Sequence, residues 1–297
     1  MAGTRSKFLI SLFLGVLMPV AQATPTETLS YRIYYKGWLS AMQELPIAEA
    51  RLVTEQAEAG RLEVSTLSLS SAAHEVVDSL YPIRYRLRSL YDPQANQLVA
   101  MERFKRTRKV KHDLAWVDGL TGRLHYLRAD GNRPAAALPA RLQPWLADSV
   151  FAESDKDAVA VPAGLLDRLA LLQAVRRQIP AAGQVLVLPV TDGPKTFRYQ
   201  VRLDGVERMS IAGRQWPAWR LRVEGYEQRP GEAPSEEADH APILLWVSQD
   251  AERLPLRFHI DHSVGGFTVE WAPGDLPVAV ALDAPISPSG NAWVDEG

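Results

Sequence analysis

The stretch LLWVSQDAERLPLRFHIDH, residues 244 to 262, holds a serine, two histidines and several carboxylates. These are the residue types of acyl transfer and hydrolysis: His259 and Asp261 could form a base and its orienting group, with Ser248 as nucleophile. However, side chains two residues apart on a strand point in parallel and do not converge. No serine lies in a G-x-S-x-G elbow between a strand and a helix. We therefore expect a hairpin with a solvated polar face and no catalytic residue.

The register of the following hairpin stays open in the sequence. Gly265 and Gly266 can form its turn, because glycine tolerates the positive φ of tight hairpins. A two-residue turn there places Asp261 opposite Glu270, whereas a four-residue loop places His259 opposite Glu270. Both registers keep the apolar side chains of the two strands on one face.

Histidine spacing argues against a metal site. His259 and His262 are three residues apart, so on one strand they point to opposite faces. The chain has no cysteine, and it has neither an H-E-x-x-H motif nor an acidic calcium loop. We therefore expect no metal and no cofactor.

A basic cluster in residues 102 to 113 could contact an anionic surface. Lipid headgroups and envelope polysaccharide are the polyanions that an exported protein meets. The alternative is a solvated hairpin whose cations keep an edge strand from pairing with other chains. The candidate contact residues are Lys105, Arg106, Arg108 and Lys109.

The elements that must position these residues are mostly strands. Six segments alternate apolar and polar residues with period two, among them residues 82–91, 195–205 and 254–262. This pattern is typical of antiparallel strands with one buried face. Asp-Gly and similar pairs separate them at hairpin spacing. The sequence predicts a mainly β fold: a large curved antiparallel sheet, half-barrel or barrel-like, packed on one principal helix.

That helix is predicted over residues 163–178. Leu165, Leu169 and Leu172 return at helical spacing and should bury against the apolar face of the sheet. Arg176 falls on the same face, so it either holds an anionic headgroup or extends its guanidinium to water. Aromatic residues in strand-like segments could also line a ligand site or simply pack in the core. The candidates are Trp219, Trp246 and Trp271.

The N-terminal residues suggest export. Arg5 and Lys7 precede an apolar run and then Ala21-Gln22-Ala23, the pattern of a cleavable secretory signal over residues 1–23. We expect a single β domain over 24–272, a flexible Pro-rich tail over 273–297 and a periplasmic location. No later segment is long and apolar enough to span a bilayer as a helix. Losing Arg5 and Lys7 changes the net charge from -2 to -4, which gives no reason to expect a nucleic-acid partner.

Five segments occur in a characteristic order. They are the strand L-x-Y-R-I-Y-Y-K-G (29–37), the strand over 48–52, the helix motif D-x-L-x-L-L-x-x-V-R (167–176), the strand and turn pattern up to residue 213, and W-V-S-x-D-x-x-R-L-P (246–255). In this order they resemble an exported bacterial family catalogued as domain of unknown function 3108. Ala170 departs from the serine often found in the family's helix. The resemblance implies a secreted, mostly antiparallel β protein similar to the half-barrels of lipoprotein carriers.

Together these patterns favour a non-enzymatic periplasmic protein. It would bind an apolar or amphipathic component of the cell envelope, such as a lipid, or an envelope protein partner. The alternative is a hydrolase acting on envelope glycan or lipid, which needs converging carboxylates that a sequence cannot show. An outer-membrane barrel is disfavoured by the arginines on alternate strand positions.

Overall fold

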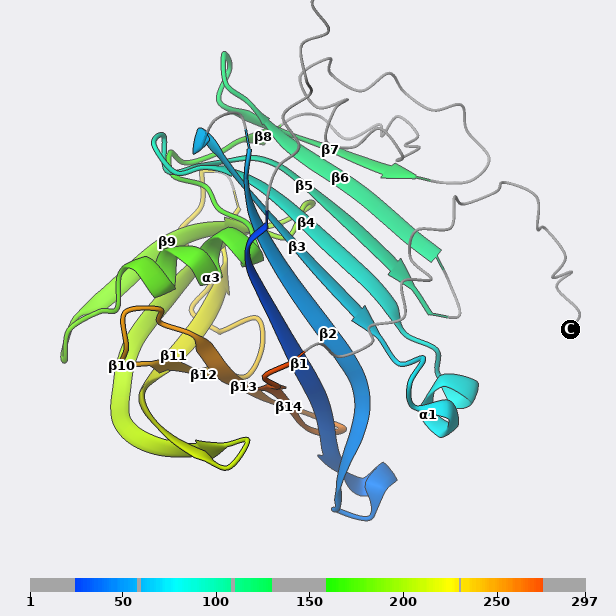
Figure 1. The fold of residues 1–297 in the computed structure, drawn as a ribbon. Helices are drawn as coiled ribbons and strands as arrows, with labels where there is room; N and C mark the ends of the chain where they lie inside the picture. Colours follow the sequence, from blue (N-terminus) through cyan, green and yellow to red (C-terminus); the bar gives the residue numbers. More distant parts are fainter. Residues whose placement is uncertain (1–24, 58–59, 108–109, 130–158, 230, 275–297) are drawn as a thin grey trace, which may run out of the picture.

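The computed structural model describes residues 25–57, 60–107, 110–129, 159–229 and 231–274. They form one antiparallel sheet of 14 strands that curves around a helix, α3 (Figure 1). This confirms the predicted mainly β class with one principal helix. The helical elements are η1 (Trp38–Ser40), α1 (Glu75–Leu80) and α3 (Arg168–Arg177). The strands are β1 (Pro25–Gly37), β2 (Glu44–Ala57), β3 (Leu62–Ser70), β4 (Arg84–Asp92), β5 (Gln97–Arg106), β6 (Val110–Asp118), β7 (Arg123–Ala129), β8 (Val159–Ala160), β9 (Val185–Thr191), β10 (Thr196–Ile211), β11 (Arg214–Glu227), β12 (Ile243–Ser248), β13 (Pro255–His262) and β14 (Gly265–Trp271).

The first and last strands join the two halves of the sheet. Strands β1 to β8 pair in sequence order, and so do β9 to β14. Strand β1 then pairs with β14, with Tyr31 opposite Trp271 and Gly37 opposite Gly265. The sheet therefore has β8 and β9 at its two edges, and its centre is the seam between strands from opposite ends of the sequence.

The segment just before α3 ties the edge strand β9 to the middle of the other half. The Leu165 carbonyl accepts from the Leu98 amide at 2.8 Å, and the Leu166 amide donates to Pro189 at 2.9 Å. The Leu166 carbonyl accepts in turn from the Thr191 amide at 2.8 Å. These bonds hold the curved sheet in its wrapped form, because they link strands β5 and β9 across the concave side.

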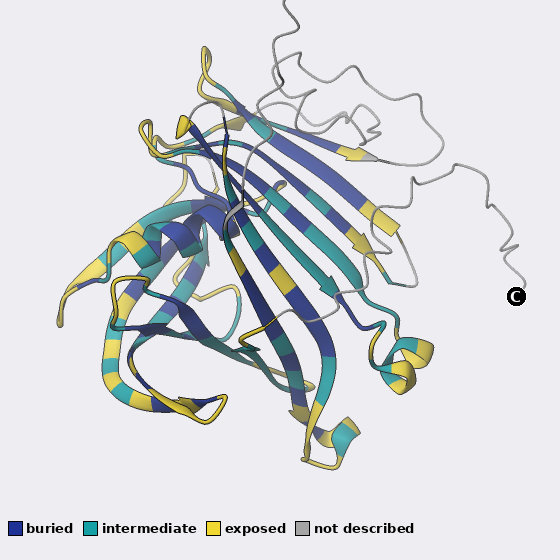
Figure 2. Ribbon diagram, viewed as in Figure 1, coloured by how far each residue is buried: buried dark blue, intermediate teal, exposed yellow. Residues whose placement is uncertain are grey.

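Along several strands apolar residues lie on the concave face and charged residues on the other, as the alternation predicts. Ile83, Tyr85 and Leu87 of the β4 region all line the concave side, whereas Arg84 and Arg86 alternate with them. Buried and exposed positions alternate along β10 in the same way (Figure 2). Phe258 likewise lines the concave side, and its neighbour Arg257 faces Glu270 on the other side.

Helix α3 begins later than the sequence predicts, at residue 168 and not 163, and ends at 177. The carboxylate of Asp167 caps it by accepting from the Ala170 amide at 2.8 Å. Leu165 is therefore not part of the helix: it lies in the extended segment whose carbonyls bond to the sheet. The predicted helical spacing of Leu165 with Leu169 thus misreads its local structure, although both side chains are buried.

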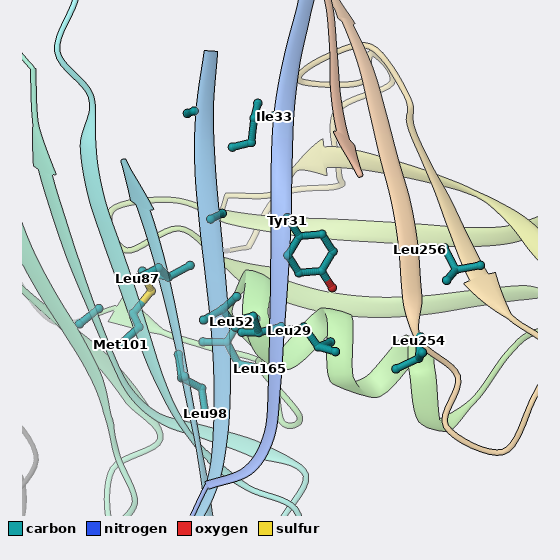
Figure 3. Packing of buried hydrophobic residues seen from close by; sticks show 14 of the residues in the cluster. Leu29, Tyr31, Ile33, Leu52, Leu87, Leu98, Met101, Leu165, Leu254 and Leu256 are labelled. Carbon is teal, nitrogen blue, oxygen red and sulfur yellow. The ribbon is translucent and has the colours of Figure 1, made fainter. Parts of the chain in front are cut away.

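Two clusters of buried apolar residues lie on the concave side, between the sheet and α3, and a third, which includes Leu62, Leu90 and Leu114, lies on the opposite face of the sheet. Leu165 packs in one cluster with Leu29, Leu52 and Leu87 (Figure 3), and Leu169 belongs to the same cluster. Leu166, Ala170 and Val175 pack in a second cluster against β9 to β12. Each fully buried leucine contributes about 1.5 to 3 kcal/mol, so the helix and its preceding segment anchor both halves of the sheet.

Parts of the domain prediction fall outside the described residues. The expected signal segment, residues 1–23, is one, and residues 275–297 of the expected tail are another. Within the described part, none of the helices has the length and apolar character needed to cross a bilayer.

Candidate functional site

The concave face and helix α3 enclose a cavity of about 600 Å³. This lies within the range of about 300 to 1,000 Å³ typical of small-molecule sites. Leu169, Leu172 and Val175 form its helical wall. Among the described residues that line it there is no aspartate or glutamate. Its sheet wall includes Ile33, Leu67, Leu87, Val223, Leu245, Phe258 and Val269.

Three tyrosines give the cavity its inner polar groups. Tyr31 is 2% exposed, and within the described part of the chain its hydroxyl has no hydrogen-bond partner. Burial raises the pKa of Tyr31, Tyr85 and Tyr199, so all three hydroxyls are neutral at physiological pH. An unpaired buried hydroxyl costs about 1 to 3 kcal/mol. A ligand atom beside Tyr31 would recover part of that energy.

Cationic groups stand at the open side of the cavity. Lys105 of β5 and Arg168, the first residue of α3, line it and are exposed. The Arg168 guanidinium is 4.0 Å from the Asp192 carboxylate. His259 of β13 also lines the cavity, and its Nδ1 is 2.9 Å from the Thr268 hydroxyl. The cavity is thus apolar within and positively charged at one side.

Arg176 has no donor left for a ligand. Its Nη atoms donate to both carboxylate oxygens of Glu27 at 2.6 and 2.7 Å and to Gln173 at 3.1 Å. Its Nε and Nη2 also donate to the carbonyls of Arg253, at 2.9 Å, and Glu252, at 3.0 Å. A guanidinium has five N–H groups, and all five are used. The ligand role predicted for Arg176 is therefore replaced by a structural one: it joins β1, α3 and the β12–β13 turn.

None of the three candidate tryptophans is among the lining residues of the cavity. Trp219 packs against the cluster around α3 and β9 to β12. The Trp246 indole donates to Glu207, and its strand neighbour across β13 is Arg257 on the outer face. Trp271 packs edge-to-face on Trp216, with ring centroids 5.3 Å apart. Packing accounts for Trp219 and Trp271, whereas Trp246 lines a separate polar pocket on the outer face.

The basic cluster divides between the cavity and the surface. Lys105 lines the cavity, and it lies directly opposite Lys111 of β6. Arg106 is exposed at the end of β5. Arg108 and Lys109 lie outside the described residues. Like charges directly opposite each other destabilise a sheet, so the lysine pair marks a position where an anion would be stabilising.

The family model for a protein of unknown function, DUF3108, matches residues 30–271. The chain belongs to the DUF3108 family. One solved structure, a β-barrel-like protein of domain of unknown function DUF1849 from Brucella abortus, has a TM-score of 0.48 and 7% sequence identity. The alignment covers 82% of this chain and 94% of that one. No curated protein matches the chain in sequence.

The stretch 244–262 of this DUF3108 chain forms a hairpin in which the polar groups bond to one another. The Ser248 hydroxyl donates to Asp250 at 2.7 Å and accepts from the Leu254 amide at 2.7 Å. Ser248 is 1% exposed, so it has neither the free hydroxyl nor the access of a nucleophile. Groups of three or more possible metal ligands are absent from the part of the chain that the structure describes.

The register after this stretch differs from both predicted alternatives. The turn is Ser263-Val264, so His262 pairs with Gly265 and Asp261 with Gly266. Glu270 therefore faces Arg257 and forms an ion pair with it. Gly265 and Gly266 belong to β14. Position 265 requires glycine, because a Cβ there would lie 2.6 Å from the Lys36 carbonyl.

A polar cluster that sequence reasoning missed lies in β4 to β6 of the DUF3108 chain. Glu102 is 0% exposed, and its carboxylate is 2.8 Å from His112 Nε2 and 3.2 Å from Arg86. The alternation within residues 82–91 places Arg86 on the polar face of the sheet. The alternating arginines of β4 and the single glutamate of β5 were the sequence signal for this cluster. Which arginine meets Glu102 depends on the β4–β5 register, which the sequence does not give.

A second buried carboxylate, Asp113 of β6, has its oxygens occupied. It accepts from Arg103 at 2.7 Å, from Tyr126 at 2.7 Å and from Arg128 at 3.0 Å. Burial alone would raise the pKa of Asp113, but these hydrogen bonds lower it below its ordinary value. A carboxylate held ionised by three donors stabilises the sheet and is unsuited to proton transfer.

Proposed function

We propose that this DUF3108 chain is an exported periplasmic protein that binds an apolar or amphipathic component of the cell envelope in its cavity, without catalysis. The observation that carries the proposal is the cavity itself: about 600 Å³, apolar inside, with cations at its open side. Such a site suits an acyl chain whose polar end faces the cations. The apolar segment 8–20 and the following Ala21-Gln22-Ala23 support export.

Lys105 is the group best placed to meet the polar end of the ligand. It lines the cavity, and the described residues provide no ion-pair or hydrogen-bond partner for it. Its neighbour across the sheet, Lys111, adds to the positive potential. A carboxylate or phosphate there would offset the repulsion between the two ammonium groups. The ligand is therefore an amphiphile with an anionic end.

The hydrolase has weaker support: a polar pocket on the outer face is lined by two carboxylates, Glu44 and Glu270, but Glu270 is held in an ion pair with Arg257. Hydrolysis needs an accessible nucleophile or converging carboxylates. The described residues that line the cavity include no carboxylate, and the Ser248 hydroxyl is buried and already bonded.

Identification of the bound molecule tests the proposal. The chain is purified from its native envelope without detergent, extracted with organic solvent, and the extract is analysed by mass spectrometry. We expect one class of acyl-chain amphiphile in near-stoichiometric amount. The same extraction of an Ala50→Phe variant is the control, because Ala50 lines the cavity and a phenyl ring there fills it. Equal lipid in both extracts, or none in either, would overturn the proposal.

Export has a separate test. Sequencing the N-terminus of the chain recovered from the periplasm should give residue 24 as the first. Recovery of the chain from the cytoplasm with residues 1–23 attached would contradict the proposed location.

A further inference from the structure

The turn between β1 and β2 displays three large apolar side chains to solvent. Trp38 is 69% exposed, Leu39 is 67% exposed and Met42 is 62% exposed. They lie in η1 and in the residues that follow it, before β2 begins at Glu44. Clusters of exposed apolar residues are unusual on a soluble protein and mark surfaces that contact another molecule or a membrane.

This turn is ordered by its own hydrogen bonds, so the exposure does not come from fraying. The Met42 amide donates to the Gly37 carbonyl at 2.9 Å, and the Ser40 hydroxyl donates to Gln43 at 2.6 Å. The Tyr35 hydroxyl fixes the base of the turn by donating to the Val264 carbonyl at 2.6 Å. Ala41 and Met42 adopt φ of 49° and 63°. Residues other than glycine rarely adopt such φ values, which often occur at functional sites.

More apolar residues are exposed at the same end of the sheet. In an antiparallel meander every second connection lies at the same end. The β3–β4 connection holds helix α1, where Val76 is 74% and Leu80 69% exposed. Figure 1 shows η1 and α1 at the same lower end of the sheet, and Figure 2 shows much of α1 as exposed. Val110 follows the β5–β6 turn and is 54% exposed.

Positive charge accompanies these residues. Arg106 ends β5 and Lys111 lies near the start of β6, so both stand at the β5–β6 turn. Both are exposed, and neither has an ion-pair partner among the described residues. At α1, Asp78 is paired with Arg84 at 2.7 Å. By the same alternation the acidic loop that joins β11 to β12 also lies at this end, but in the other half of the sheet order, away from the β5–β6 turn.

We infer that this end of the sheet docks on a lipid bilayer that contains anionic lipid. Trp38, Leu39 and Met42 insert at the interface, while Arg106 and Lys111 contact headgroups. Tryptophan prefers the boundary between headgroups and acyl chains, and each cation near an anionic surface strengthens binding. The exposed apolar residues lie on three separate turns, and the cations Arg106 and Lys111 lie at the third of them, the β5–β6 turn. A lipid surface accommodates that arrangement better than a protein interface, which needs one continuous packed patch.

The cavity extends to the docking end. Ile83, at the end of the α1 connection, and Phe267, beside the β13–β14 turn, both line it. Docking would therefore bring this end of the cavity close to the membrane, the source of an amphiphilic ligand. The docking inference itself rests on the exposed turns and goes beyond the proposed ligand binding.

Vesicle co-sedimentation of the mature full-length chain tests this inference. The vesicles are pure phosphatidylcholine, or phosphatidylcholine with about one third phosphatidylglycerol to supply the anionic surface. The variants are Trp38→Ser with Leu39→Ser, and Arg106→Ser with Lys111→Ser. The matched control is Leu120→Ser, because Leu120 is 98% exposed but lies in the β6–β7 turn at the other end of the sheet.

We expect the wild-type chain to bind the anionic vesicles and to release them as salt is raised. The Trp38/Leu39 variant should lose about tenfold or more in affinity, the Arg106/Lys111 variant should lose the preference for anionic vesicles, and Leu120→Ser should bind as the wild type does. Equal binding by the Trp38/Leu39 and Leu120 variants would overturn the inference. So would a wild-type chain that ignores vesicles but crosslinks through position 38 to an envelope protein.

Discussion

Arg176 of helix α3 and Glu27 of strand β1, 149 residues apart in sequence, form a bidentate ion pair with Nη–Oε distances of 2.6 and 2.7 Å. The pair connects the helix that closes the cavity to the strand at the centre of the sheet. The same guanidinium holds the β12–β13 turn through two carbonyls. One side chain thus fixes the position of α3 relative to both halves of the sheet.

Replacing this arginine should destabilise the fold. Arg176→Met leaves the Glu27 carboxylate and two carbonyls without their donor, and we expect a loss of about 2 to 4 kcal/mol in the free energy of unfolding, less than for a fully buried pair because Glu27 is partly exposed. Urea unfolding measures it. The control is Arg222→Met, which removes an exposed arginine paired with Glu224 and should cost less than about 1 kcal/mol. Equal losses in both variants would contradict the role assigned to Arg176.

Asp167 should make stability depend on pH. Its burial raises the pKa of the carboxyl from 3.8 to about 6. Below pH 4 the group is protonated in the folded and unfolded states and carries no penalty. As pH rises through 6 the folded state must bury an ionised carboxylate, so stability falls by up to about 3 kcal/mol.

The variant Asp167→Asn keeps a helix-capping acceptor but does not titrate. Its stability relative to the wild type should therefore increase between pH 4 and pH 7, as measured by urea unfolding at several pH values. Asp261→Asn, at a side chain that is 82% exposed, is the control and should follow the wild-type profile. A constant difference between Asp167→Asn and wild type across this range would show that the buried carboxyl does not titrate as described.

The seam between β1 and β14 should not tolerate a side chain at Gly265. This glycine has φ of +141°, and a Cβ would lie 2.6 Å from the Lys36 carbonyl and 2.8 Å from the Gly37 Cα. Gly265→Ala should lower the free energy of unfolding by about 2 kcal/mol more than Gly274→Ala. Gly274 also has positive φ, of +111°, but no atom lies near its Cβ position. Similar losses at the two glycines would mean that the strands do not pair in this register.

The charge at position 105 should select the ligand. Lys105→Ser should weaken binding of a fatty acid about tenfold and leave binding of the fatty alcohol of the same chain length unchanged, since the alcohol has no carboxylate to lose a partner. Competition against a fluorescent probe measures both affinities. If Lys105→Ser weakened the binding of acid and alcohol equally, Lys105 would shape the cavity and would not recognise the anionic end of the ligand.

The sequence alone predicts the strands and their buried faces. Period-two alternation places Phe258 inside and Arg257 outside, and burial follows because the concave face packs on the helix. The sequence does not determine the register of β13 with β14. Gly265 and Gly266 look like a turn locally, but they are needed where β14 passes close to β1, a contact between strands more than 200 residues apart.

The helix and the site show the same limit. The spacing of Leu165, Leu169 and Leu172 predicts burial, which is complete for the first two and partial for Leu172. The start of α3, however, depends on bonds from Leu165 and Leu166 to distant strands. Arg176 is found at the predicted place in the last turn of the helix. Its role could not be predicted, because Glu27 and Arg253 reach it only through the fold.

The most direct test of the proposed cavity is titration of a fluorescent fatty acid into the delipidated wild-type chain and the Ala50→Phe variant. Ala50 is buried on β2 and lines the cavity. The wild type should bind the probe with about 1:1 stoichiometry at micromolar affinity, Ala50→Phe should bind it at least about tenfold more weakly while remaining folded, and Leu120→Phe should match the wild type. Equal probe binding by wild type and Ala50→Phe, or no binding by either, would contradict the account.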